Sequence, residues 1–124
     1  AWREWLLRAV AGRPDQLRIM YGLAGERRLP EMELPWLPGY EGSTPVRTGN
    51  GAYDQFQLDV FGEVLGPVEL VGAALVAEAW DDWRAERDLV ERLEEVWKLP
   101  DEGIWEVRGP QRHFVHSKVM AWVA

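Results

Sequence analysis

The segment from Pro100 to His116, read PDEGIWEVRGPQRHFVH, places a carboxylate among arginines and aromatic rings without clear helical or strand periodicity. If Ile104 to Arg108 is extended, Ile104, Glu106 and Arg108 share one face because side chains alternate along a strand. Desolvation by Ile104 would favour the protonated carboxyl, whereas Arg108 would favour the anion. The segment therefore predicts either a general acid or a fixed carboxylate at Glu106. A lone glutamate in a loop is more often an arginine's ion-pair partner.

Two other catalytic chemistries have little support in the sequence. His113 and His116 could bracket a metal ion on a helical turn, but no third ligand follows at a recognised spacing. Ser117 adjoins His116 without the oriented third group that a nucleophilic triad requires. The chain has no cysteine, which excludes thiolate catalysis, disulfides and cysteine-ligated zinc. We therefore expect no metal and no other cofactor.

Residues 29–50 form a second candidate region, in which prolines at 30, 35, 38 and 45 and glycines at 39, 42 and 49 forbid a long regular element. Loops of this length are usually functional or disordered. Trp36 and Tyr40 supply flat apolar faces, while Arg47 and Asn50 supply planar hydrogen-bonding groups. This combination suits a sugar. Alternatively, the two rings simply hold the loop against the rest of the domain.

Hydrophobic spacing predicts mainly helical structure around these loops. Helices are expected over residues 2–10, over 52–65 and from 117 to 124. In the helix over 52–65, Gln55 and Asp59 would share a polar stripe that faces either a polar cavity or solvent. Residues 17–21 alternate in part and predict a short strand.

The most regular helical pattern lies over residues 79–97, after a break or kink at Gly66–Pro67 and a helical continuation over 68–77. This helix is expected to bury one apolar stripe and to expose a charged, solvated face. The predicted stripe comprises Trp80, Trp83, Val90, Leu93 and Trp97, with Leu89 and Val96 beside it.

The composition indicates one acidic domain. The chain has 124 residues, of which 47% are hydrophobic and eight are tryptophan, enough to bury a core. Its net charge of -7 and the lack of a basic stripe disfavour a nucleic-acid partner. The longest clean apolar run, residues 70–77, is far shorter than the roughly 18 residues of a membrane span. We therefore expect a soluble, cytoplasmic protein with no membrane partner.

Motifs in a defined order run along almost the whole chain. They are YG at 21–22, LPE at 29–31, LPGYEGS at 37–43, PVRTGN at 45–50, QFQLDVFGEV at 55–64, DEGIWEVRG at 101–109, RHF at 112–114 and SKVMAWVA at 117–124. Together they resemble the glucoamylase and trehalase family, glycoside hydrolase family 15, and the second half resembles its catalytic-acid segment. Several spaced motifs in order are specific, although each alone would be weak.

The resemblance implies an all-α fold, a partial (α/α)6 toroid with a long Pro/Gly-rich loop and at most a short β-element. Because both ends of the chain fall within helical patterns, residues 1–124 are expected to be a single internal fragment of the catalytic barrel. Its general-acid loop would span about residues 98–116. A fragment of this size would supply only about a third of the ring.

The resemblance also implies an inverting hydrolase that releases glucose from an α-linked oligosaccharide or from trehalose by general acid/base catalysis. Glu106 matches the family's general acid, and the general base would lie outside this chain, so the fragment alone is expected to be inactive. The predicted substrate-binding residues are Trp105, Arg108, Arg47, Asn50, Tyr40 and Gln55.

Two alternatives stay open from the sequence. The chain could be a non-catalytic helical module that binds carbohydrate or a protein partner through the same aromatic loop. Alternatively, a truncated ring would leave apolar helix faces uncovered, and such faces drive self-association.

Overall fold

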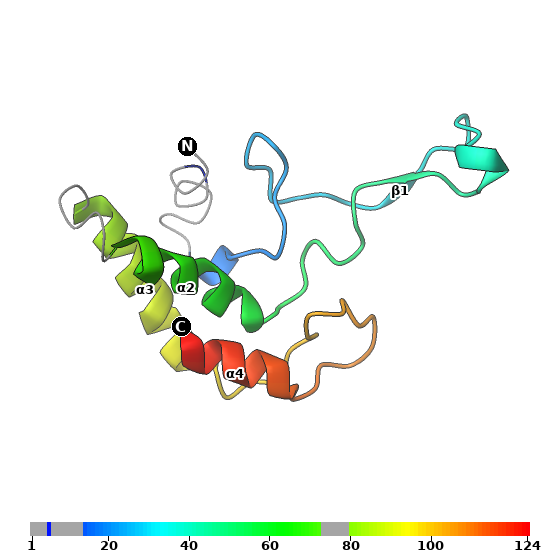
Figure 1. Cartoon of the computed structure of the whole chain (residues 1–124). Coiled ribbons are helices and arrows are strands. Elements are labelled where there is room, and N and C mark those ends of the chain that lie inside the picture. The colour runs from blue at the N-terminus through cyan, green and yellow to red at the C-terminus, as the bar shows by residue number, and fades with distance from the viewer. Residues whose placement is uncertain (1–4, 6–13, 73–79) are drawn as a thin grey trace.

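The computed structural model describes residue 5, residues 14–72 and residues 80–124. Its regular structure is mainly helical, with α2 at Asp59–Gly72, α3 at Trp80–Val96 and α4 at Val115–Val123 (Figure 1). The predicted helical class is therefore confirmed, whereas the toroid stays a prediction. Apart from residue 5, the predicted helix over 2–10 lies outside the described residues, as do residues 73–77 of the predicted continuation.

The remaining elements are short. They are the 3-10 helices η1 (Pro14–Gln16) and η2 (Tyr40–Gly42) and the strands β1 (Met32–Glu33) and β2 (Arg47–Thr48). β1 and β2 pair antiparallel inside the predicted 29–50 loop, with Met32 opposite Thr48 and Glu33 opposite Arg47. The loop therefore closes into a narrow hairpin that extends away from the helices (Figure 1).

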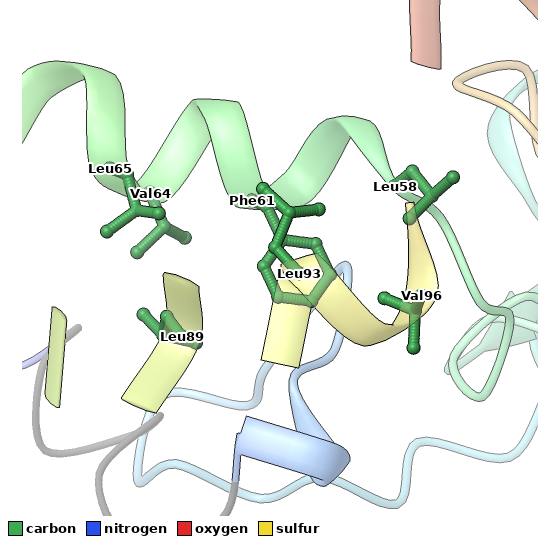
Figure 2. Packing of buried hydrophobic residues seen from close by; sticks show 7 residues of the cluster. All are labelled: Leu58, Phe61, Val64, Leu65, Leu89, Leu93 and Val96. Atoms are coloured by element: carbon green, nitrogen blue, oxygen red, sulfur yellow. The ribbon is translucent and has the colours of Figure 1, made fainter. Parts of the chain in front are cut away.

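The hydrophobic core lies mainly between α2 and α3 (Figure 2). Leu58, immediately before α2, and residues spaced three or four apart on α2 face a matching row on α3. The buried side chains are Leu58, Phe61, Val64, Leu65, Leu89, Leu93 and Val96. α4 packs against another part of α2, where a Cβ at Gly62 would lie 2.5 Å from the Met120 carbonyl oxygen. Gly62 thus permits the close approach of these two helices.

The predicted bounds of α3 are accurate within a residue at each end, but the predicted buried stripe is wrong in part. Trp83, Trp97 and Val90 are 56%, 46% and 39% exposed. Leu93 is buried as predicted, and so are Leu89 and Val96, which were predicted beside the stripe. The prediction placed the tryptophans at the centre of the buried stripe because indole rings are large and apolar. In the structure, α3 contacts α2 through the neighbouring face, which carries Leu89, Leu93 and Val96. The side chain of Trp80 lies outside the described part of the chain.

The predicted start of the helix at residue 52 is also wrong, because α2 begins at Asp59. The N–H groups of Phe56 and Leu58 donate to the carboxylates of Glu102 and Asp101, at 2.9 and 3.0 Å. The two carboxylates thus accept hydrogen bonds from main-chain N–H groups that would otherwise need helical partners. The segment before Asp59 can therefore stay non-helical. Gln55 therefore precedes the helix and does not share a helical stripe with Asp59.

Two further local predictions differ from the structure. The predicted break at Gly66–Pro67 is wrong, because α2 runs through both residues, whereas the alternative of a kink there stays a prediction. A glycine before proline removes the side chain that would clash with the proline ring, which makes the helical conformation more accessible. Residues 17–21 are irregular rather than a strand. Leu17 and Tyr21 instead pack against the core, and the Tyr21 hydroxyl accepts a hydrogen bond from the Arg18 N–H at 3.0 Å.

Across the described residues, none of the helices combines the length and apolar character that crossing a bilayer requires.

The position of the core can be tested by substituting adjacent residues on α3. Leu89→Ala removes a side chain that is 1% exposed and should lower the free energy of unfolding by about 2–5 kcal/mol. The control Val90→Ala removes a side chain that is 39% exposed and should cost about 1 kcal/mol or less. Urea unfolding of both variants checks this. A larger loss for Val90→Ala would show that the predicted stripe, not the observed one, is buried.

Candidate active site

Glu106 closes a tight turn rather than lying in an extended segment. Its N–H donates to the Gly103 carbonyl at 3.2 Å, and its own φ is 51°, in the left-handed region. A non-glycine residue held there costs about 1–2 kcal/mol. The alternation expected over residues 104–108 is therefore wrong, so Ile104, Glu106 and Arg108 do not share a strand face. The turn presents the carboxyl group on a constrained backbone.

Gly103 permits this turn for two reasons. Its φ is 71°, a conformation that L side chains rarely adopt. A Cβ at this position would also lie 2.8 Å from the Phe114 ring. Phe114 therefore packs against the backbone that leads into Glu106.

The base of the loop that carries Glu106 is closed by main-chain pairing between Asp101 and Arg112. Each N–H donates to the other residue's carbonyl at 2.9 Å. The fully buried carboxylate of Asp101 accepts from the Leu58 N–H at 3.0 Å. Glu102 bonds Phe56 through both its N–H and its carboxylate, at 3.0 and 2.9 Å. These contacts fix the loop against the segment that precedes α2.

Asn50 is the hydrogen-bond partner of the Glu106 carboxyl group in the described structure. Its Nδ2 lies 3.4 Å from Oε1 and 3.2 Å from Oε2, across 56 positions of sequence. Asn50 is itself fixed, because its Oδ1 accepts from the Ala52 N–H at 2.8 Å and its N–H donates to the Leu29 carbonyl at 2.9 Å. The structure therefore brings two predicted site residues together through a neutral donor.

Arg108 and Arg47 both contact Glu31, a residue to which the sequence assigned no role. Arg108 Nη2 lies 3.1 Å from Glu31 Oε2, and Arg47 Nε lies 3.6 Å from Oε1. Arg47 Nη2 also lies 3.1 Å from Glu33 Oε1. The hydrogen bond from Arg108, followed by the one from the Gly51 N–H, holds the pKa of Glu31 below its ordinary value. Glu31 thus remains an anion between two cations.

The other predicted site residues lie at different distances from this cluster. Gln55 adjoins it, because its Nε2 donates to the Val107 carbonyl at 3.3 Å. Trp105 lies on the same turn as Glu106 and is 86% exposed. Tyr40, 83% exposed, belongs to η2 at the far end of the hairpin, away from the 100–114 loop (Figure 1). The structure therefore does not bring Tyr40 to Glu106.

A buried polar cluster lies where α2 and α4 begin. Asp59 is almost fully buried, and its Oδ2 lies 3.9 Å from His116 Nδ1. Burial raises the pKa of Asp59, and the nearby His116 opposes this shift when it is protonated. Among the described residues, no group of three or more His, Cys, Asp or Glu side chains is arranged to hold a metal ion. His116 contacts Asp59 with its side chain 46% exposed.

The sequence profile of glycosyl hydrolases family 15 matches residues 1–124, and the chain belongs to this family. It is similar to several proteins named trehalase. It is 47% identical to the Mycolicibacterium smegmatis trehalase, over 91% of this chain and 17% of that protein. Against the Mycobacterium tuberculosis trehalase the identity is 46%, over 87% of this chain and 16% of the relative.

The archaeal trehalase 1 of Sulfolobus acidocaldarius is 41% identical, over 87% of this chain and 20% of its own length. The chain therefore spans no more than 20% of the length of these three relatives. No solved structure matches the chain.

The buried carboxyl group of Asp59 gives the fold a defined response to pH. Its pKa in the folded chain lies above its ordinary value of 3.8, so the native state binds this proton more tightly than the unfolded state. The stability that it contributes is present below this ordinary value and is lost as the pH rises through the folded pKa. Asp59→Asn cannot ionise. Its free energy of unfolding relative to the wild type should therefore increase as the pH rises from about 4 to 7.

Urea unfolding at several pH values measures this difference, with Asp54→Asn as an exposed control. A difference that decreases with rising pH would mean that the Asp59 anion is stabilised, by His116 or by the main chain, more than burial penalises it.

Proposed function

We propose that this chain supplies the general acid and part of the sugar pocket of an inverting α-glucoside hydrolase, and that its substrate is trehalose. The observation that carries the proposal is the Glu106 carboxyl group, which is held on a strained turn by the neutral amide of Asn50. The family match and the trehalase names of the relatives support the activity and the substrate.

An inverting glycosidase needs one protonated and one ionised carboxyl group on opposite sides of the scissile bond. Glu106 donates its proton to the glycosidic oxygen as the bond from that oxygen to the anomeric carbon breaks. A water molecule then attacks the anomeric carbon from the opposite face and gives its proton to a glutamate outside this chain. The products are two glucose molecules, one of which carries the inverted configuration.

The neutral partner of Glu106 suits a group that must carry a proton. A guanidinium ion hydrogen-bonded to the carboxyl group would stabilise the anion, whereas an amide donor adds no charge. Asn50 Nδ2 can hold one carboxyl oxygen while the other points its proton towards the substrate. This arrangement orients the acid without fixing it in the ionised form.

The remaining predicted residues are assigned to sugar binding. The exposed ring of Trp105 offers a flat face for the C–H surface of glucose. Arg108 and Arg47 keep N–H groups beyond those bound to Glu31, and these can donate to sugar hydroxyls. Gln55 adjoins the same turn, while Tyr40 would need movement of the hairpin to contribute. Residues 1–124 are thus proposed to be one part of the catalytic domain.

Substitution of the acid tests the mechanism in the complete enzyme that contains this chain. Glu106→Gln preserves size but cannot donate the proton, so kcat on trehalose should fall about 10²–10⁴-fold. α-Glucosyl fluoride, whose leaving group needs no proton, should be hydrolysed with a much smaller loss. Glu94→Gln, an exposed substitution on α3, is the matched control. Near-normal trehalose turnover by Glu106→Gln would rule out Glu106 as the acid.

The substrate and the stereochemistry can be measured in one experiment. Proton NMR during early turnover of trehalose should show equal initial amounts of β-glucose and α-glucose, because one glucose is released with inversion at the attacked carbon. Only α-glucose at early times would indicate retention. Faster glucose release from maltose than from trehalose would instead assign a starch-type substrate. Saturable trehalose binding by a complete protein that never releases glucose would favour the binding-module alternative.

A further inference from the structure

Arg108 follows Glu106 by two positions, yet its guanidinium binds a carboxylate 77 positions away in the sequence. The partner is Glu31, at 3.1 Å, on the segment that enters β1. Gly51 lies directly beneath this pair. A Cβ on Gly51 would lie 3.2 Å from Arg108 Nη2, and the Gly51 N–H donates to Glu31 Oε2 at 3.4 Å. The Arg108 guanidinium is thus held over the backbone of the residue next to Asn50.

This placement bears on how Glu106 can work as an acid. An arginine close in sequence can reach a carboxylate and stabilise its anion, which opposes proton donation. In the structure Glu106 instead receives the neutral Asn50 amide, while the Arg108 charge is matched by Glu31. The 29–50 loop thus supplies separate partners for two residues of the 100–114 loop, Asn50 for Glu106 and Glu31 for Arg108.

We propose that Glu31 is a positioning residue that holds the Arg108 guanidinium away from Glu106, so that Glu106 receives the neutral Asn50 amide instead of a cation. The inference rests on the proposed function, in which Glu106 is the general acid. It assigns to Glu31 no contact with the substrate. Its effect passes entirely through Arg108.

Other charged groups border this site, but none of those described holds Arg108 away from Glu106. Arg47 and Glu33 pair with each other on the hairpin, where Arg47 also contacts Glu31. Asp101 and Glu102 lie at the base of the turn and bind main-chain N–H groups. His116 pairs with Asp59 at the start of α4, and His113 precedes that helix. Of the described carboxylates, Glu31 is therefore the one that contacts Arg108, and its removal releases Arg47 from the same contact as well.

The test is the pH dependence of kcat/KM for trehalose in the complete enzyme carrying Glu31→Ala. Released Arg108 would pair with Glu106 and favour its anion, so the alkaline limb should move to lower pH by about one unit. Glu33→Ala is the matched control, because Glu33 contacts Arg47 but not Arg108. Its alkaline limb should coincide with that of the wild type. The alkaline limb of Glu31→Asp, which keeps the charge, should lie close to that of the wild type.

A double variant separates positioning from general damage to the fold. If Glu31 acts through Arg108, the alkaline limb of Glu31→Ala/Arg108→Gln should coincide with that of Arg108→Gln alone. The inference would be overturned if the alkaline limb of folded Glu31→Ala coincided with that of the wild type. It would also be overturned if Glu31→Ala still shifted the limb in the Arg108→Gln background. If Glu31→Ala does not fold by circular dichroism, Glu31→Gln is measured and judged by the same criterion.

The two proposals fail in different ways. Trehalose turnover that survives Glu106→Gln would refute the general-acid assignment itself. Loss of turnover in Glu106→Gln, together with an unmoved alkaline limb in Glu31→Ala, would leave Glu106 as the acid and refute only the role of Glu31.

Discussion

The buried carboxylate of Asp101, bound to the Leu58 N–H, is the contact on which the arrangement of this chain depends. It ties the start of α2 to the loop that carries Glu106, and Glu102 repeats the connection at Phe56. A buried charged acceptor is costly without donors, and main-chain N–H groups without acceptors are costly as well. The Leu58 N–H and the Asp101 Oδ2 atom thus satisfy each other, and the helical core and the loop that carries Glu106 become parts of one structure.

The sequence allowed prediction of the elements whose stability is mainly local. α3 has a continuous helical pattern that ends shortly before Pro100, so its bounds followed from periodicity. The start of α2 did not, because residues 52–58 have helix-compatible spacing, but two of them, Phe56 and Leu58, give their N–H groups to side chains about 45 positions away. The buried face of α3 was likewise set by contact with α2, since Leu89 and Trp83 fit helical stripes equally well.

In the candidate site, too, some features could be predicted from the sequence and others depend on contacts between distant residues. The motif resemblance pointed to Glu106 and Asn50, and the structure places their side chains in hydrogen-bonding contact. Glu31 belongs to the LPE motif of the resemblance, but the sequence assigned it no role, because an acid in a proline-rich loop has no periodicity and its arginine partners lie 16 and 77 positions further along the chain. The left-handed φ of Glu106 was equally hidden, since glutamate, unlike glycine, does not indicate that conformation.

The antiparallel pairing of Asp101 with Arg112 has a consequence for how this segment tolerates insertions. Because the two ends of the loop are bonded to each other, an added residue between them need not displace α3 or α4. Insertions should therefore be tolerated best at exposed positions inside the closure, such as Gly109 and Pro110, and worst at the two paired residues.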